Sequence, residues 1–306
     1  MDNITHTLLG AALAQAGLKR ATRFGTGALL IGANLPDVDG FSYLFTSSGE
    51  ALAFRRGWTH GILAMIVWPF VLAGILWGLS RLSRKDEPVR PGALLLLAAI
   101  AVWSHPLLDL LNVYGVRLLM PFSQHWFKAD ALFIIDPWVW GLFLAAVALG
   151  AIRRTHRPAR YALGIFAGYA ILMAILGAVG RDVVARKTGL AARTMAAPVF
   201  GNPLRRTVLR DLGREYESGE LFFGLRPRYL PRGRIPTGWD QPGVAEALAS
   251  GQAQWFLRWA RFPVFAAEPA GESWRVRIND IRFGRIRGMS WASVTLDVPR
   301  HGGSSR

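Results

Sequence analysis

Histidine and aspartate residues stand at the ends of apolar segments of this 306-residue chain. They are His6, Asp37, Asp39, His60, His105, Asp109 and Asp136. His105 and Asp109 are four residues apart, a spacing that puts both side chains on one face of a helix. Imidazole and carboxylate groups are ligands for zinc, and sets rich in carboxylates also suit manganese or magnesium. The chain has no cysteine, which excludes thiolate ligands. These residue types predict a divalent-metal site.

The elements that must position these residues are apolar runs. Three of them are long enough, or nearly so, for a hydrocarbon core that needs roughly 20 residues, and a fourth, residues 134–152, carries Asp136 and Pro137 near its start. The three cover residues 61–79, 92–111 and 161–179. Two shorter runs, 4–18 and 24–35, predict a short helical hairpin before them. Hydrophobic residues make up 52% of the chain and charged residues 18%, a balance typical of membrane proteins.

Basic residues in the loops between these runs predict an orientation. The clusters are Lys19, Arg20 and Arg23; Arg81, Arg84, Lys85 and Arg90; and Arg153, Arg154, Arg157 and Arg160. If every run crosses once, all three clusters fall on one face, which the positive-inside rule makes cytoplasmic. The His and Asp residues then all fall on the opposite, non-cytoplasmic face. Arg55 and Arg56 depart mildly from this pattern.

The sequence pattern of the chain changes from about Thr194. Frequent prolines interrupt it, and residues 274–281 alternate as a strand does. The predicted fold is therefore an α-helical integral membrane domain, residues 1–188, with four long spans and an N-terminal hairpin. A small β-containing extramembrane domain, residues 189–306, follows on the non-cytoplasmic side.

The net charge of +16 could indicate a protein that binds nucleic acid. The basic residues form small clusters between apolar runs and not one dense stripe. Anionic lipid head groups explain such clusters. We therefore expect membrane lipids as partners and no nucleic acid.

Several stretches resemble the YdjM family of inner-membrane metal-dependent hydrolases. They are residues 1–10 (MDNITHTLLG), 34–39 (NLPDVD), 56–60 (RGWTH), 105–109 (HPLLD), 115–136 with its MPFS core at 120–123, and 198–204 (PVFGNPL). The resemblance covers most of the chain. It implies a bacterial inner-membrane location and a hydrolytic activity, without naming a substrate.

A weaker resemblance is to zinc-dependent bacterial phospholipases C and fungal single-strand nucleases. These share the order His, Asp, His and then His-x-x-x-Asp. His6, Asp39, His60, His105 and Asp109 could occupy that order here. No convincing His ligand follows Asp109, so the resemblance implies one or two metal ions and not three.

These observations together lead to a hypothesis: a metal-dependent hydrolase of a phosphoester, possibly lipid-linked, with zinc as the expected metal. His6, Asp39, His60, His105 and Asp109 would bind the metal. Asp37 or Asp136 would be a further ligand or the base that orients water.

The remaining polar residues leave alternatives open. Arg117 could hold an anionic substrate group, or it could pair with lipid phosphate or Asp130. Asp136 before Pro137 is a common way to begin a helix. Metal transport or sensing is one alternative function, which would need carboxylates deep in the spans. A non-catalytic assembly protein is another.

Overall fold

The computed structural model describes residues 1–82, 89–191, 193–284 and 292–300. The chain forms two compact units. The first, which we call the helical unit, comprises Met1–Gly40, Arg56–Val179 and Ala197–Pro203. The second, the β unit, comprises Phe41–Arg55, Gly180–Ala196 and Leu204–Arg306. The predicted boundary between residues 188 and 189 stays a prediction.

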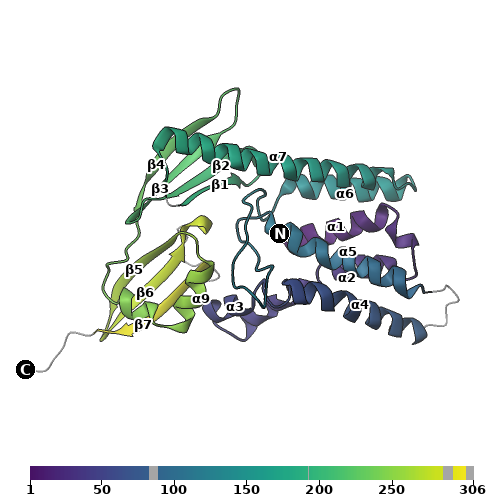
Figure 1. Ribbon diagram of the computed structural model, residues 1–306, viewed down its shortest axis with the longest axis horizontal. Helices are drawn as coiled ribbons and strands as arrows, with labels where there is room; N and C mark the ends of the chain where they lie inside the picture. Colours follow the sequence, from purple (N-terminus) through teal and green to yellow (C-terminus); the bar gives the residue numbers. More distant parts are fainter. Residues whose placement is uncertain (83–88, 192, 285–291, 301–306) are drawn as a thin grey trace, which may run out of the picture. The chain divides into compact units, whose positions relative to one another are not determined.

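The helical unit is built from helices that pack side by side with alternating chain direction (Figure 1). Its elements are α1 (Asn3–Gln15), η1 (Leu18–Arg20), α2 (Gly25–Gly32), the start of η2 (Leu35–Leu44), α4 (Ile62–Leu82), α5 (Pro91–Leu110), α6 (Pro137–Ile152) and most of α7 (Arg157–Thr188). Neighbouring pairs in space are α1 with α2 and α6, and α5 with α2 and α4. Chain direction alternates, so the ends that carry His and Asp meet at one end of the unit.

Three helices in the described part of the chain are long and apolar enough to cross a membrane. They are α4, α5 and α7, with 21, 20 and 32 residues. The prediction of four long spans is not confirmed, because α6 is apolar but only 16 residues long. At 1.5 Å per residue it extends about 24 Å, less than the roughly 30 Å of a hydrocarbon core. Pro137 starts α6 at its first position, which shortens the expected run of residues 134–152.

Two apolar cores hold the helical unit together. Leu9, Leu108, Phe143 and Met173 join α1, α5, α6 and α7. A second core joins α2, α4 and α5 through residues such as Leu29, Leu72 and Leu97. Gly10 lets α1 approach α2 closely, because a Cβ there would lie 2.7 Å from the carbonyl oxygen of Leu29. These contacts fix where the His and Asp side chains meet.

In its described residues the β unit contains two sheets, three short α-helices, the 3-10 turn η3 (Ile281–Phe283) and the end of α7. One sheet has the order β1 (Arg193–Val199), β2 (Asn202–Asp211), β3 (Glu215–Phe222) and β4 (Arg228–Pro236). The other has the order β5 (Pro263–Ala270), β6 (Ser273–Asp280) and β7 (Ser293–Pro299). The helices are α3 (Ser48–Phe54), α8 (Val244–Leu248) and α9 (Gly251–Trp259). The expected C-terminal β structure is therefore present.

Candidate metal centre

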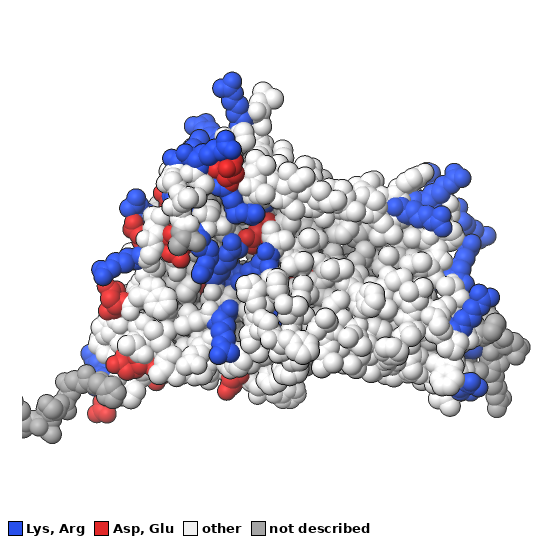
Figure 2. All heavy atoms as spheres, in the orientation of Figure 1, with Lys and Arg blue, Asp and Glu red and all other residues white. Residues whose placement is uncertain are grey.

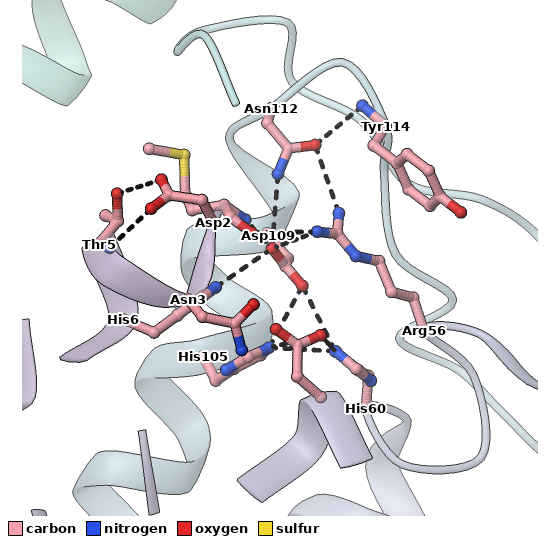
Figure 3. Close-up of polar contacts among 12 residues, drawn as sticks. Asp2, Asn3, Thr5, His6, Arg56, His60, His105, Asp109, Asn112 and Tyr114 are labelled. Atoms are coloured by element: carbon pink, nitrogen blue, oxygen red, sulfur yellow. Dashed lines mark hydrogen bonds and ion pairs between the residues drawn. The ribbon is translucent and has the colours of Figure 1, made fainter. Parts of the chain in front are cut away.

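One end of the helical unit brings together six of the predicted residues from four separate segments. His6 comes from α1, Asp37 and Asp39 from η2, His60 from the turn before α4, and His105 and Asp109 from the last two turns of α5. The close-up shows His6, His60 and His105 gathered around the carboxylate of Asp109 (Figure 3).

Four of these residues have the arrangement of a metal-ligand set. Asp37, His60, His105 and Asp109 each offer one ligand atom, and these atoms all lie within 4.8 Å of one another. His60, His105 and Asp109 have no exposed surface, whereas Asp37 is partly exposed. Burial of charged groups is costly unless they are paired or coordinate a metal. The set therefore fits a divalent cation.

The backbone fixes how His105 faces the centre. Its Nδ1 lies 2.6 Å from the carbonyl oxygen of Ala33. Because a carbonyl oxygen only accepts, Nδ1 carries the hydrogen. In the neutral ring, Nε2 then presents a lone pair, and it lies 3.4 Å from Asp109 Oδ2 and 3.7 Å from Asp37 Oδ1.

Asp39 orients His60 from outside the four-residue group. The Thr59 hydroxyl donates to Asp39 Oδ2 at 2.6 Å and therefore accepts from His60 Nδ1, 2.8 Å away. Asp39 Oδ2 is also 3.3 Å from His60 Nδ1. This is the carboxylate–histidine arrangement that commonly supports a metal ligand. The structure thus places Asp37, expected as a further ligand or as the base, among the four grouped residues, and Asp39, an expected ligand, behind His60.

The two histidines meet at their Nε2 atoms, which face each other as lone pairs when both rings are neutral. His60 Nε2 and His105 Nε2 are 3.1 Å apart, and each Nδ1 is already a donor to a different oxygen. Two neutral rings in this arrangement repel each other, and Asp109 Oδ2, 3.4 Å from both, adds further negative charge. A cation between these atoms removes the repulsion. The orientation of the two rings is the main structural argument for a metal.

Arg56 balances the charge of Asp109 on its other side. Its Nη2 is 3.1 Å from Asp109 Oδ1, and the guanidinium stacks 4.5 Å from the centre of the Tyr114 ring. The backbone N–H of Arg56 donates to Asp39 Oδ2 at 2.7 Å from a left-handed conformation with φ of 49°. Arg56 therefore contacts the carboxylates of both Asp109 and Asp39. A left-handed backbone at a residue other than glycine is strained, and such strain is typical of functional sites. The α-amino group of Met1 also contacts Asp109 Oδ1.

Sequence reasoning missed Arg56, which it treated as a mild violation of the charge pattern. The available signal was a basic residue at the end of the unit that carries the His and Asp residues, four residues before His60. Its guanidinium also donates to the carbonyl oxygen of Gly115 at 3.2 Å, which joins the centre to the loop between α5 and α6.

The imidazole of His6 is buried beside the four-residue group. Its ring stacks on His105 with centroids 3.7 Å apart, and its Nε2 lies 3.5 Å from Asp109 Oδ1. Neither ring nitrogen has a hydrogen-bond partner among the described residues. A buried imidazole normally finds a partner, so His6 is a candidate for a further ligand. Its predicted role as a ligand stays a prediction.

The structure does not bring Asp136 into this cluster. Its Oδ1 accepts the backbone N–H groups of Trp138 and Val139, and its Oδ2 accepts the Tyr169 hydroxyl at 3.0 Å. These contacts cap α6 and anchor α7. They match the alternative that the sequence left open, a residue that begins a helix.

Arg117 is buried in the loop and has protein partners. It is 1% exposed, donates to Gln124 Oε1 at 2.7 Å and lies over the Trp126 ring. A Cβ on Gly57 would lie 2.5 Å from its guanidinium, so the two segments are tightly packed. These contacts do not favour the predicted role in substrate binding. His125 is exposed in the same loop.

The carboxyl of Asp37 is held in its ionised form. Burial alone raises its pKa, but in the metal-free protein the hydrogen bond and charge of a protonated His105 outweigh burial and hold the pKa well below its usual range. An ionised, partly exposed carboxylate can bind a cation.

Comparison with known proteins agrees with the resemblance seen in the sequence. The sequence model of the YdjM inner membrane protein family matches residues 1–181. The chain is also 27% identical over 160 residues to "Uncharacterized protein YfhP" of Bacillus subtilis (strain 168). That similarity covers 49% of this chain and 46% of the relative, so the chain spans about half the length of the relative. No solved structure matches.

Proposed function

The chain belongs to the YdjM inner membrane protein family, and we propose that its helical unit is a metal-dependent phosphoester hydrolase. The observation that carries the proposal is the pair of Nε2 atoms of His60 and His105, 3.1 Å apart beside Asp109. A proton could also relieve their repulsion. A metal is the better explanation because Asp37 and Asp109 complete a four-residue set with one ligand atom each.

We assign the four grouped residues as ligands of one divalent cation, with zinc as the first choice. Two imidazole nitrogens and two carboxylate oxygens suit zinc, and Mn²⁺ or Mg²⁺ accept such oxygens. Asp39 and Thr59 keep Nε2 of His60 directed at the centre. Arg56 balances the charge of Asp109 and keeps its Oδ2 directed at the two histidines.

The hydrolytic part of the proposal rests on chemistry. A divalent cation at this position would polarise a phosphoryl oxygen and lower the pKa of a water to about 7. Asp37 is the least buried member of the group, so we assign it the contact with incoming water and the acceptance of its proton. Asp136 is not needed in this scheme.

The distribution of carboxylates supports a surface reaction over metal transport. In the described parts of α4, α5 and α7, the acidic residues are Asp109 and Asp182. Asp109 lies in the last turn of α5, and Asp182 lies in the last two turns of α7. A transport path would need polar groups along the middle of the spans. The apolar middle of these helices therefore favours hydrolysis at one end.

We further propose that the metal centre faces the non-cytoplasmic side and that the substrate is lipid-linked. The loops at the opposite end of the helical unit carry the basic clusters, which the positive-inside rule places in the cytoplasm. Apolar side chains in the loops at the end of the unit that carries the centre are exposed, among them Trp58 and Phe122, at 52% and 85%. Such residues suit an entry from the membrane interface. The chain after α7 would lie on the same non-cytoplasmic side.

The test is hydrolysis by the full chain in detergent. Chromogenic phosphomonoesters and phosphodiesters would be offered with Zn²⁺, Mn²⁺ or Mg²⁺, to the wild type, His105→Gln and Asp37→Asn. We expect metal-dependent turnover in the wild type and a loss of about 100-fold or more in both variants. His125→Gln is the matched control and should keep full activity. Equal rates in all four proteins would contradict the proposal. A wild type that binds metal but hydrolyses nothing would point to metal sensing.

A further inference from the structure

A second site lies at the end of the helical unit opposite to the metal centre. A cavity of about 330 Å³ opens at the turn between α1 and α2. Its lining residues are Lys19, Arg20, Thr22, Arg23, Phe24, Gly25 and Thr26. This volume is within the roughly 300–1,000 Å³ of typical ligand sites.

The charge of this cavity is strongly positive. Three of its seven lining residues are Lys or Arg, and no carboxylate is among them. Lys19 donates to the side-chain oxygen of Gln15 at 2.8 Å, a neutral partner that does not cancel its charge. An anion is therefore the ligand that the cavity fits.

The floor of the cavity is held in place by the fold. Thr22 is 7% exposed, and its Oγ1 accepts the backbone N–H of Arg90 at 2.9 Å, which ties the turn to the start of α5. Gly25 packs on the backbone of Lys19, where a Cβ would lie 2.9 Å from the carbonyl oxygen. Phe24 adopts a left-handed conformation with φ of 65°. The cavity is thus part of the helix packing.

The surroundings carry the same sign of charge. Lys and Arg gather at the right-hand edge of Figure 2, at the ends of helices of this unit. The turn between α6 and α7 belongs to this end, because Arg160 donates to the carbonyl oxygen of Ala16 at 2.9 Å. In the described part of the helical unit, the carboxylates lie in the elements of the other end. They are Asp2, Asp37, Asp39, Asp109, Asp130 and Asp136.

We propose that this cavity binds the phosphate of an anionic phospholipid, such as phosphatidylglycerol, from the cytoplasmic leaflet. Phosphate matches the three cations, and basic residues next to spans attract anionic head groups. The helices that reach this end expose apolar side chains, as Leu79 and Leu82 of α4 do at 49% and 82%, against which acyl chains can lie. This site needs the proposed orientation of the chain but not its hydrolytic activity.

The experiment compares two triple variants of the full chain in detergent. Lys19→Gln/Arg20→Gln/Arg23→Gln removes the charge of the cavity. Arg153→Gln/Arg154→Gln/Arg157→Gln removes the same charge from exposed positions near the turn between α6 and α7. Native mass spectrometry would measure binding of phosphatidylglycerol and phosphatidylcholine. Inorganic phosphate and glycerol 3-phosphate, as soluble competitors, separate a lipid site from a site for free phosphate.

We expect the wild type and the control triple to prefer phosphatidylglycerol, and the cavity triple to lose at least about tenfold in binding. An equal loss in both triples would mean general attraction and would overturn the proposal, as would no loss in either. Binding of soluble phosphate as tight as that of the lipid would also overturn it. If the cavity triple does not fold, Thr26→Glu should weaken lipid binding while Thr26→Gln leaves it intact. Metal content of the same samples reports separately on the metal centre.

Discussion

His60 Nε2 and His105 Nε2 lie 3.1 Å apart. The Nδ1 atom of His105 donates to the backbone carbonyl of Ala33, and the Nδ1 atom of His60 donates to the hydroxyl of Thr59. Tertiary contacts therefore fix both rings before any ligand binds. Without a metal, one ring must take up a proton to relieve the repulsion. With a metal, both lone pairs become ligands.

A chelator should therefore destabilise the helical unit. We expect EDTA to lower the Tm of metal-loaded wild type and Zn²⁺ to restore it, since a ligand at 100 times its Kd contributes about 2.7 kcal/mol. Thermal unfolding in detergent would measure the shift. His105→Gln should show almost none. If neither EDTA nor Zn²⁺ changes the Tm of the wild type, the result would contradict a bound metal.

Asp37 and Asp39 should differ in their effect on affinity. Asp37→Asn removes a grouped ligand atom, whereas Asp39→Asn weakens the orientation of His60. We expect Asp39→Asn to weaken metal binding by about 10–100-fold and Asp37→Asn to weaken it more. Competition with a fluorescent zinc chelator would give both constants. The opposite order would mean that Asp39 is the ligand and that the centre rearranges on binding.

Arg56 should stabilise the fold as well as the site. Arg56→Gln leaves Asp109 buried without its guanidinium partner, and breaking such a pair costs about 3–5 kcal/mol. Thermal unfolding of metal-free protein would show this as a lower Tm. Arg55→Gln removes the same charge from the neighbouring position and should have the smaller effect. Equal shifts of Tm in both variants would contradict the assigned role of Arg56 as the partner of Asp109.

Much of the site could be predicted from the sequence, because two different sets of residues agree. Lys and Arg set the direction of the helices, and that direction places His6, His60 and Asp109 at one end. The family was also identified correctly from short motifs. These inferences need only the period of the helix and the charge of the loops.

Assignments that depend on tertiary contacts could not be predicted. Asp37 and Asp39 are two residues apart and chemically identical, and only the position of His60 separates them. Arg56 acts through a left-handed backbone that no periodicity reveals. The length of α6 depended on where Pro137 would start the helix.

The β unit offers a test of acid stability away from the membrane. Burial raises the pKa of the Asp280 carboxyl, but the charge and hydrogen bonds of Arg282 outweigh burial and hold the pKa below 3.8. Because the pKa of Asp280 is lower in the folded chain than in the unfolded chain, its ionised carboxylate stabilises the fold. This stabilisation is fully present above the pKa of the unfolded chain and is lost as pH falls through the pKa of the folded chain.

Asp280→Asn should therefore lower the free energy of unfolding of the β5–β7 sheet at neutral pH by about 3–5 kcal/mol, since it breaks a buried ion pair. Acidification should then destabilise this variant less than the wild type. Hydrogen exchange of β5–β7 at several pH values would measure both effects. Asp297→Asn, which breaks the exposed pair with Arg275, should change little. A large effect at neutral pH in the control, or none in Asp280→Asn, would contradict this account.

The central claim is that this cluster binds a metal ion. The most direct measurement is metal content by mass spectrometry on detergent-purified protein, for the wild type, His105→Ala and Asp109→Ala. His125→Ala, in an exposed loop, is the control, and membrane insertion of all four proteins is checked in parallel. We predict stoichiometric zinc or manganese in the wild type and control, and its loss in the two variants with insertion intact. A wild type that stays empty when metal is supplied, or variants that retain the metal, would contradict the account.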